Sequence, residues 1–118
     1  MAHRVLVVED NGALRFALRV MLEYEPYVEE VETVSSGESA LAIAQNFNPD
    51  VVVTDHGLPG LSGEEVAQRI RKLCPRARII SFSGNDETAP WADERVTKGA
   101  GISIDQLRAA VSHGPHAA

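Results

Sequence analysis

Three short runs of mostly β-branched residues constrain the fold of this chain more than any other feature. They cover residues 5–8, 51–54 and 79–82. Runs that are apolar without alternation fit strands covered on both faces, and such strands form parallel sheets. A weaker, alternating run at 28–34 fits an edge strand, and a last short strand is expected at 95–97.

Helical patterns lie between these strands and after the last one. Their apolar positions recur at the spacing of one helix face: Leu14, Leu18, Met21 and Leu22; Ala40, Ile43, Ala44 and Phe47; Val66, Ile70 and Leu73; and Ile104, Leu107 and Val111. Strands that alternate with helices form βαβ units, whose crossovers are right-handed. We therefore expect an α/β fold with an open, doubly wound parallel sheet.

Capping boxes mark three of the expected helix starts. In each, a serine hydroxyl and the side chain three residues later satisfy free backbone donors. The pairs are Ser35 with Glu38, Ser62 with Glu65, and Ser103 with Gln106, the last accompanied by Ile102 and Leu107 in the positions of a hydrophobic staple.

Composition limits the partners of the chain. Its 118 residues include 17 acidic and 11 basic ones, and the net charge of −6 repels a phosphate backbone. Cys74 is the only cysteine, which excludes an internal disulfide or a cysteine-rich zinc site. The apolar run before Glu9 is too short for a signal peptide or a membrane span. We expect a cytoplasmic protein that binds neither nucleic acid nor membrane.

Five polar side chains follow the predicted strands and should meet at one edge of the sheet, where such folds bind ligands. They are Glu9, Asp10, Asp55, Ser83 and Lys98. Three neighbouring carboxylates repel one another unless a cation or proton lies among them, and hard oxygen ligands favour Mg²⁺. Ca²⁺ is less favoured because the chain has no EF-hand loop. A lysine and a hydroxyl beside such a cluster suit an incoming phosphoryl group.

Four motifs resemble the receiver domain of response regulators, the two-component signalling family. They are residues 4–11 with Arg15, residues 55–59 with Gly63, Ser83-Gly84 and Thr97-Lys98. The resemblance covers residues 3–111 and implies a flavodoxin-like fold with strand order 2-1-3-4-5. We expect a single receiver domain over residues 1–118, with its core at 3–111 and a frayed tail at 112–118.

The resemblance also implies residue roles. Asp55 corresponds to the phosphoacceptor, Asp10 to a direct Mg²⁺ ligand, and Glu9 to a ligand that binds directly or through water. The carbonyl of Gly57 corresponds to a backbone ligand, Ser83 to the switch hydroxyl, and Lys98 to the phosphoryl-binding lysine. The expected function is acceptance of a phosphoryl group from a sensor histidine kinase or a histidine phosphotransfer protein. Output would pass to a downstream protein by contact, without turnover of an external substrate.

Other interpretations remain open at this stage. The chain could be a docking module on the receiver fold that phosphorylation does not regulate, or the receiver part of a hybrid kinase. A phosphatase of the haloacid-dehalogenase type needs a second Asp where this chain has Gly57, and a flavin carrier needs a phosphate-binding loop where Glu9 and Asp10 are acidic. Asp10 alone could be a helix cap and Ser83-Gly84 a turn. His56 could flank the phosphoryl group or be an exposed loop residue.

Three departures from the family pattern lead to further expectations. Arg95 stands where the family has an aromatic residue of its switch, and a guanidinium cannot turn inward unpaired. Gly99 replaces a proline, so we expect a trans peptide or a strained loop. Residues 84–94 are too few for a full helix between two connections, and Pro90 interrupts them. Trp91 is expected to pack over the sheet surface that this helix would cover.

Overall fold

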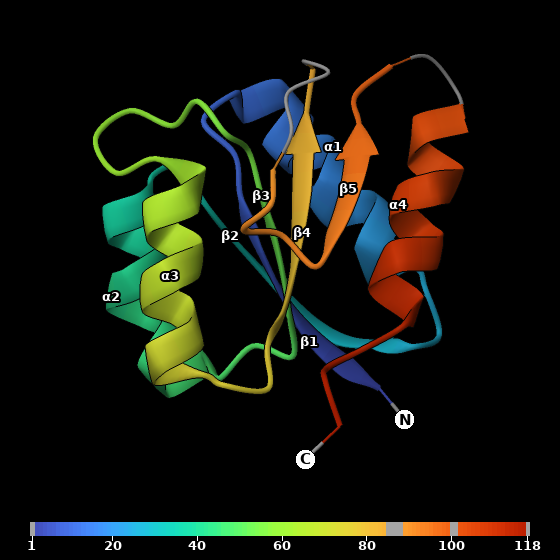
Figure 1. The fold of residues 1–118 in the computed structure, drawn as a ribbon. Helices are drawn as coiled ribbons and strands as arrows, with labels where there is room; N and C mark the ends of the chain where they lie inside the picture. Colours follow the sequence, from blue (N-terminus) through green and yellow to red (C-terminus); the bar gives the residue numbers. More distant parts are fainter. Residues whose placement is uncertain (1, 85–88, 100–101, 118) are drawn as a thin grey trace.

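A computed structural model describes residues 2–84, 89–99 and 102–117 of the chain. Strands and helices alternate along it (Figure 1) as β1 (His3–Val8), α1 (Gly12–Glu23), β2 (Val28–Val34), α2 (Gly37–Phe47), β3 (Val51–Thr54), α3 (Gly63–Leu73), β4 (Arg78–Ser83), β5 (Glu94–Thr97) and α4 (Ile102–Ser112). The five strands are parallel and lie in the order β2-β1-β3-β4-β5, which confirms the expected α/β fold.

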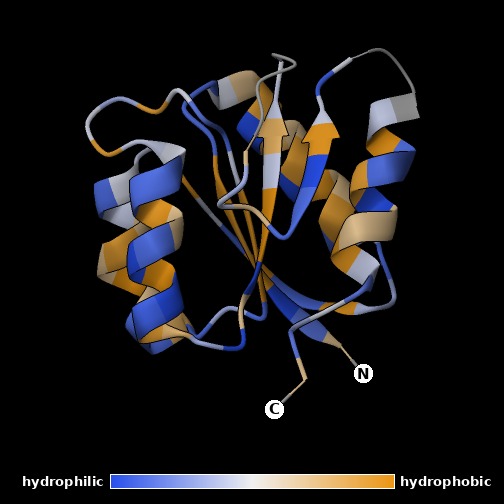
Figure 2. Cartoon of the chain, viewed as in Figure 1, coloured by the Kyte–Doolittle hydropathy of each residue, from blue (hydrophilic) through white to orange (hydrophobic). Residues whose placement is uncertain are grey.

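The sheet is covered on both faces. Helices α2 and α3 lie on one face, and α1 and α4 lie on the other (Figure 1). Along β1, Val5 and Val7 enter the core with α1 and α4, whereas Leu6 and Val8 enter the core with α2 and α3. Because both faces are buried there, positions 5–8 of β1 are all apolar, and the apolar colour runs along the central strands in Figure 2.

One of the three expected capping boxes forms at its predicted place. The Ser62 hydroxyl accepts a hydrogen bond from the Glu65 main chain at 3.2 Å, and the Glu65 carboxylate accepts one from the Ser62 main chain. The box at Ser35 is wrong, because Ser36 is the cap of α2 and accepts from Ser39 at 3.1 Å. Glu38 instead accepts a hydrogen bond from the main chain of Leu61 at 2.9 Å.

The cap predicted at Ser103 is also wrong. Ser103 lies inside α4, where its hydroxyl donates to the Gly99 carbonyl at 2.8 Å and accepts from the Gly99 main chain at 3.2 Å. The hydroxyl therefore ties α4 back to the end of β5. The staple at Ile102 involves a side chain outside the described residues. No cis peptide occurs among the described residues, so the bond between Lys98 and Gly99 is trans, as expected.

The connection from β4 to β5 contains no helix at Gly84 or at 89–93; residues 85–88 lie outside the described residues. Trp91 packs against the core cluster beneath α2 and α3, which confirms its expected place over the sheet. The connection then closes onto β4, because the main chain of Asp93 donates to Ile79 at 2.8 Å.

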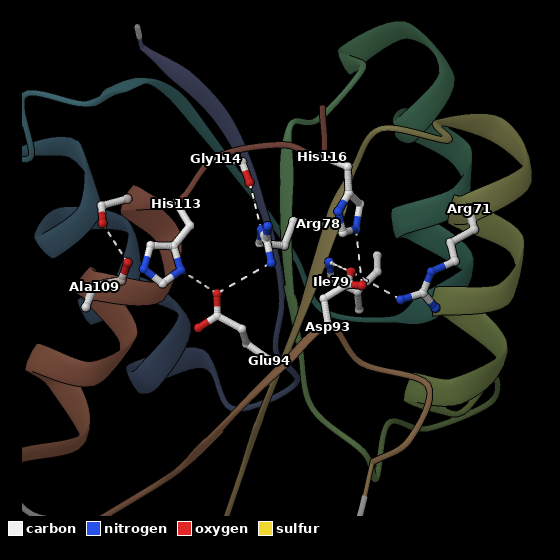
Figure 3. A network of polar contacts seen from close by, with 10 residues as sticks. Arg71, Arg78, Ile79, Asp93, Glu94, Ala109, His113, Gly114 and His116 are labelled. Atoms are coloured by element: carbon white, nitrogen blue, oxygen red, sulfur yellow. Dashed lines mark hydrogen bonds and ion pairs between the residues drawn. The ribbon is translucent and has the colours of Figure 1, made fainter. Parts of the chain in front are cut away.

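The segment after α4 follows a bonded path, which differs from the expected frayed tail. The Arg78 guanidinium donates to the Gly114 carbonyl at 3.0 Å, and the main chain of His116 donates to Arg76 at 2.8 Å. Two imidazoles contact carboxylates, His113 with Glu94 and His116 with Asp93 (Figure 3). The tail therefore lies across the amino ends of β4 and β5. No helix in the described part of the chain is long and apolar enough to cross a membrane.

Candidate functional site

Asp55 lies directly after β3, where the sheet opens at its carboxyl edge. Its main chain still donates to the Val8 carbonyl of β1 at 3.4 Å, which keeps the ends of the two strands together. One carboxylate oxygen, Oδ1, accepts from the main chain of His56 at 2.7 Å. The other, Oδ2, lies 2.8 Å from the Lys98 ammonium. Both oxygens of the carboxylate are thus held by donors of the chain.

Glu9 and Asp10 extend β1 into the same edge. The Glu9 side chain is only 3% exposed, and its two oxygens contact Lys98 at 2.8 Å and the main chain of Asn11 at 3.1 Å. Asn11 is the cap of α1, because its side-chain oxygen accepts from Leu14 at 2.9 Å. The interpretation of Asp10 as a helix cap is therefore wrong. The exposed Asp10 carboxylate belongs to the acidic cluster instead.

The three carboxylates can present oxygens to one cation. One oxygen each from Glu9, Asp10 and Asp55 lies within 4.8 Å of the others. Carboxylate oxygens are the ligands that Mg²⁺ takes in proteins, usually with retained waters, and the set contains no nitrogen or sulfur ligand that would favour a transition metal. The donor set therefore fits Mg²⁺.

Lys98 is placed by the parallel pairing of β4 and β5. Its main chain donates to the Ser83 carbonyl at 2.8 Å, which brings the buried Ser83 and the lysine to the same edge. Burial alone would lower the pKa of Lys98, but the hydrogen bonds and charges of Asp55 and Glu9 together outweigh it and raise that pKa. The lysine is thus a fixed cation facing two carboxylates.

A close backbone approach requires glycine at the start of α3. A Cβ on Gly63 would lie 2.2 Å from the Asp55 carbonyl, and the Gly63 main chain donates to His56 at 3.1 Å. Gly60 has a positive φ of 77°, which a residue with a side chain rarely adopts. Gly57 has neither constraint, because nothing lies within 4 Å of the place of its Cβ. Two of the three loop glycines are thus required by geometry.

One contact beside Asp55 was not indicated by the sequence. The rings of His56 and Trp91 meet edge to face, with centroids 5.2 Å apart and an interplanar angle of 63°. The Trp91 carbonyl in turn accepts from Arg71 of α3 at 2.6 Å. An aromatic residue in a connection too short for a helix was the available signal, but its partner could not be read from the sequence.

The fold and the site together define a class: doubly wound α/β domains whose carboxyl edge carries an acidic cluster paired with a lysine. The family model of the response regulator receiver domain matches residues 5–104 of the sequence. The chain therefore belongs to this family of two-component signalling domains.

Two relatives in sequence illustrate the match to this family. The chain is 37% identical over 84 residues to the transcription regulator BvgA of Bordetella pertussis, which covers 71% of this chain and 40% of BvgA. It is 46% identical over 118 residues to the virulence sensor protein BvgS of the same organism, covering 89% of this chain and 9% of BvgS. The chain thus spans about two fifths of the length of BvgA and a small part of BvgS.

A solved relative is the response regulator TrrA of Thermotoga maritima in complex with Mg²⁺ and BeF. It superimposes with a TM-score of 0.81 at 36% identity, covering 96% of this chain and 98% of TrrA. In a second structure TrrA is in complex with the histidine kinase ThkA, with a TM-score of 0.80, 36% identity and coverage of 96% and 97%.

Proposed function

We propose that the chain is a phosphoacceptor that receives a phosphoryl group on Asp55. The observation that carries this proposal is the contact of Asp55 Oδ2 with the Lys98 ammonium at 2.8 Å, inside an acidic cluster that fits Mg²⁺. A carboxylate that only capped a helix would need neither the lysine nor two further carboxylates.

In the proposed reaction an Asp55 oxygen forms a bond to phosphorus, and the bond from phosphorus to the donor nitrogen of a phosphohistidine breaks. The imidazole leaves with that electron pair and takes up a proton from water. Lys98 offsets the charge of the two anions that must approach. The main chain of His56 holds the second carboxylate oxygen in place at 2.7 Å. The chain itself is the acceptor, so no external substrate is turned over.

Glu9, Asp10 and Asp55 would hold Mg²⁺, with the Gly57 carbonyl as a proposed backbone ligand. When bound, the ion neutralises negative charge on the phosphoryl oxygens. Ser83 is proposed as the hydroxyl that approaches these oxygens, since Lys98 is bonded to its carbonyl at 2.8 Å. An acyl phosphate adds about 1.5 to 2 negative charges, enough to reposition a nearby hydroxyl and loop.

The proposed partner is a cytoplasmic histidine kinase or phosphotransfer protein, supported by the TrrA structure in complex with ThkA. Helix α1 begins beside the acidic cluster and exposes Phe16 and Val20, and Tyr24 follows as its C-cap; these residues are 68%, 38% and 84% exposed. Their spacing of four places them on one face of the helix, which we propose as the surface that docks the kinase.

A substitution on this face tests the docking surface. Phe16→Asp should lower phosphoryl transfer from autophosphorylated histidine kinases of the same organism and leave labelling by acetyl phosphate unchanged. Equal loss with both phosphoryl donors would contradict this docking surface.

A second context is supported by the match to BvgS, of which the chain covers 9% at 46% identity. In that context the domain would be the receiver part of a hybrid kinase, and its phosphoryl group would pass on to a phosphotransfer protein. The chemistry at Asp55 is the same in both contexts.

The deciding experiment is Phos-tag electrophoresis after incubation with acetyl phosphate and Mg²⁺. We expect a retarded band in the wild-type chain that is absent in Asp55→Asn. Asp50→Asn, at the opposite end of β3, is the matched control and should keep the band. No band in the wild type, together with Mg²⁺ binding by NMR, would favour a docking module that phosphorylation does not regulate.

A further inference from the structure

A ring contact between His56 and Trp91 joins two segments that are far apart in the sequence. His56 begins the loop after β3, and Trp91 lies in the connection between β4 and β5. Their centroids are 5.2 Å apart, and the edge-to-face arrangement at 63° is one that aromatic pairs favour. The loop that begins at His56 is thus in direct contact with the connection from β4 to β5.

Trp91 is held from three sides. Its side chain packs against the core cluster of α2 and α3. Its carbonyl accepts from Arg71 at 2.6 Å, and the same guanidinium contacts the Asp93 carboxylate at 3.2 Å. Within the connection, the main chain of Ala92 donates to Ala89 at 2.9 Å. Core packing thus holds the Trp91 indole, and hydrogen bonds hold the main chain around it.

His56 is, in contrast, part of the site. Its main-chain N–H donates to Asp55 Oδ1 at 2.7 Å, and its carbonyl accepts from Gly63 at 3.1 Å. Gly57, the proposed backbone ligand, is the next residue. A restraint on the His56 ring is consequently a restraint on the peptide groups that hold the Asp55 carboxylate and would bind the cation.

We propose that Trp91 is a positioning residue for the acceptor loop, acting through the His56 ring. This inference rests on the proposed site at Asp55 and adds a residue that none of the family motifs contains. In this arrangement the Trp91 indole, in the connection from β4 to β5, restrains residues 55–57 through its contact with the His56 ring. The hydrogen bond from Arg71 to the Trp91 carbonyl holds that connection against α3. Phosphorylation and the shape of the connection are thereby linked.

A purely structural role for Trp91 makes a different prediction. If the indole only fills space over the sheet, its truncation lowers stability and leaves the folded site unchanged. If it positions His56, truncation weakens cation binding by the folded domain, and the loss depends on the presence of the imidazole. The two roles separate in a double-mutant cycle.

The test is Mg²⁺ titration of the folded domain, followed by the backbone amide shifts of residues 55–57 in NMR spectra. We expect Trp91→Ala to weaken Mg²⁺ binding about three- to tenfold, the range that loss of one aromatic pair can produce. Trp91→Phe should restore most of the affinity, because it keeps a ring against His56. In the His56→Ala background, Trp91→Ala should have no further effect. The His56 ring-proton shifts should lose the ring-current contribution of the indole in Trp91→Ala.

Two further variants complete the test, one as a control and one as a second way to disturb Trp91. Ile43→Ala truncates another partly buried side chain on the same core cluster, and should lower stability without changing Mg²⁺ affinity. Arg71→Met removes the donor to the Trp91 carbonyl and should reproduce part of the Trp91→Ala effect. Unchanged Mg²⁺ affinity in Trp91→Ala, or equal loss in the presence and absence of the His56 ring, would overturn the proposal. Because the readout is Mg²⁺ binding, a wild type that is never labelled by acetyl phosphate would refute the phosphoacceptor function while leaving this test intact.

Discussion

Lys98 links two carboxylates of the candidate site, with contacts of 2.8 Å to both Glu9 and Asp55. Removing its charge in Lys98→Met leaves those carboxylates to face the incoming phosphoryl group unscreened. We expect labelling by acetyl phosphate to fall about 100-fold or more, as when a charge-stabilising donor is lost elsewhere. Mg²⁺ binding should be kept or strengthened, because the competing ammonium is gone. Initial labelling rates and an NMR titration measure the two effects; labelling at the wild-type rate would contradict the role of Lys98.

The raised pKa of Lys98 sets the pH dependence of this interaction. Desolvation lowers that pKa, and the bonds and charges of Asp55 and Glu9 more than compensate. A pKa raised on folding stabilises the fold below the unfolded value of about 10.4 and ceases to do so as pH rises through the folded value. The difference in unfolding free energy between wild type and Lys98→Met should therefore stay constant between about pH 7 and 9 and shrink above about 10.4. Urea titrations at several pH values measure it.

Gly63 and Gly57 form a matched pair for testing the acceptor loop. A Cβ at Gly63 would lie 2.2 Å from the Asp55 carbonyl, whereas one at Gly57 would meet nothing within 4 Å. We expect Gly63→Ala to lower the unfolding free energy by about 1 to 3 kcal/mol, the usual cost of overpacking. Gly57→Ala should cost much less. Urea unfolding measures both, and equal costs would show that the close approach of α3 to Asp55 does not require glycine.

At the residue scale, sequence reasoning predicted which side chains lie together but not every local partner. Glu9, Asp10, Asp55, Ser83 and Lys98 were expected to meet, and do lie at one edge, because parallel strands bring their carboxyl ends there. The cap of α2 was missed by one residue, since Ser35 and Ser36 are both suitable and the path of the chain decides between them. Ser103 was misassigned because its hydroxyl bonds to Gly99 and does not cap the helix.

Among the elements, the connection from β4 to β5 depends on Asp93 more than its surface position suggests. One carboxylate oxygen accepts from the Ile79 main chain at 2.7 Å and contacts Arg71 at 3.2 Å, while the other contacts His116 at 3.1 Å (Figure 3). Asp93→Asn should lower the unfolding free energy near neutral pH by about 1 to 3 kcal/mol, as loss of charged hydrogen bonds does. Asp105→Asn, whose side chain is 81% exposed, is the control.

The effect of Asp93→Asn should disappear in acid. Burial raises the pKa of Asp93, but the Ile79 hydrogen bond, His116 and Arg71 outweigh it and lower that pKa. A lowered pKa stabilises the fold above the unfolded value of about 3.9 and ceases to do so as pH falls through the folded value. Unfolding curves of both proteins should therefore converge below about pH 4. A difference that stays constant down to about pH 2 would contradict this assignment.

The apolar pattern identified both kinds of strand well. The edge strand β2 runs from Val28 to Val34, as its alternation predicted, and the fully buried β3 runs from Val51 to Thr54. The described part of the connection from β4 to β5, Gly84 and residues 89–93, contains no helix, as expected from the length of the connection and from Pro90. The contact of Trp91 with His56 could not be predicted in this way, because it depends on how residues 89–93 lie over the sheet.

In the whole molecule the candidate site and the tail lie at opposite ends of the strands. The strands end beside Asp55 at one edge, and the tail crosses their amino ends at the other (Figure 1). The connection that carries Trp91 also carries Asp93, which His116 contacts at 3.1 Å. The tail was misjudged from sequence because its bonds to Arg76 and Arg78 are long-range and leave no periodic pattern. These bonds make the tail part of the folded domain.

The last prediction concerns this tail. A variant that ends at Ser112 loses the bonds to Arg76 and Arg78 and the contacts of two imidazoles with Glu94 and Asp93. We expect its unfolding free energy near neutral pH to be lower than that of the wild type by about 1 to 3 kcal/mol, since each net hydrogen bond contributes roughly 0.5 to 1.5 kcal/mol.

Removal of residues 117–118 alone is the matched control. It should have little effect, because the contacts of the tail named above come from residues 113–116. Urea unfolding of the wild type and of both truncated proteins measures the difference. An unfolding free energy of the variant ending at Ser112 that equals the wild-type value would show that these contacts do not stabilise the fold, because exposed ion pairs contribute little on their own.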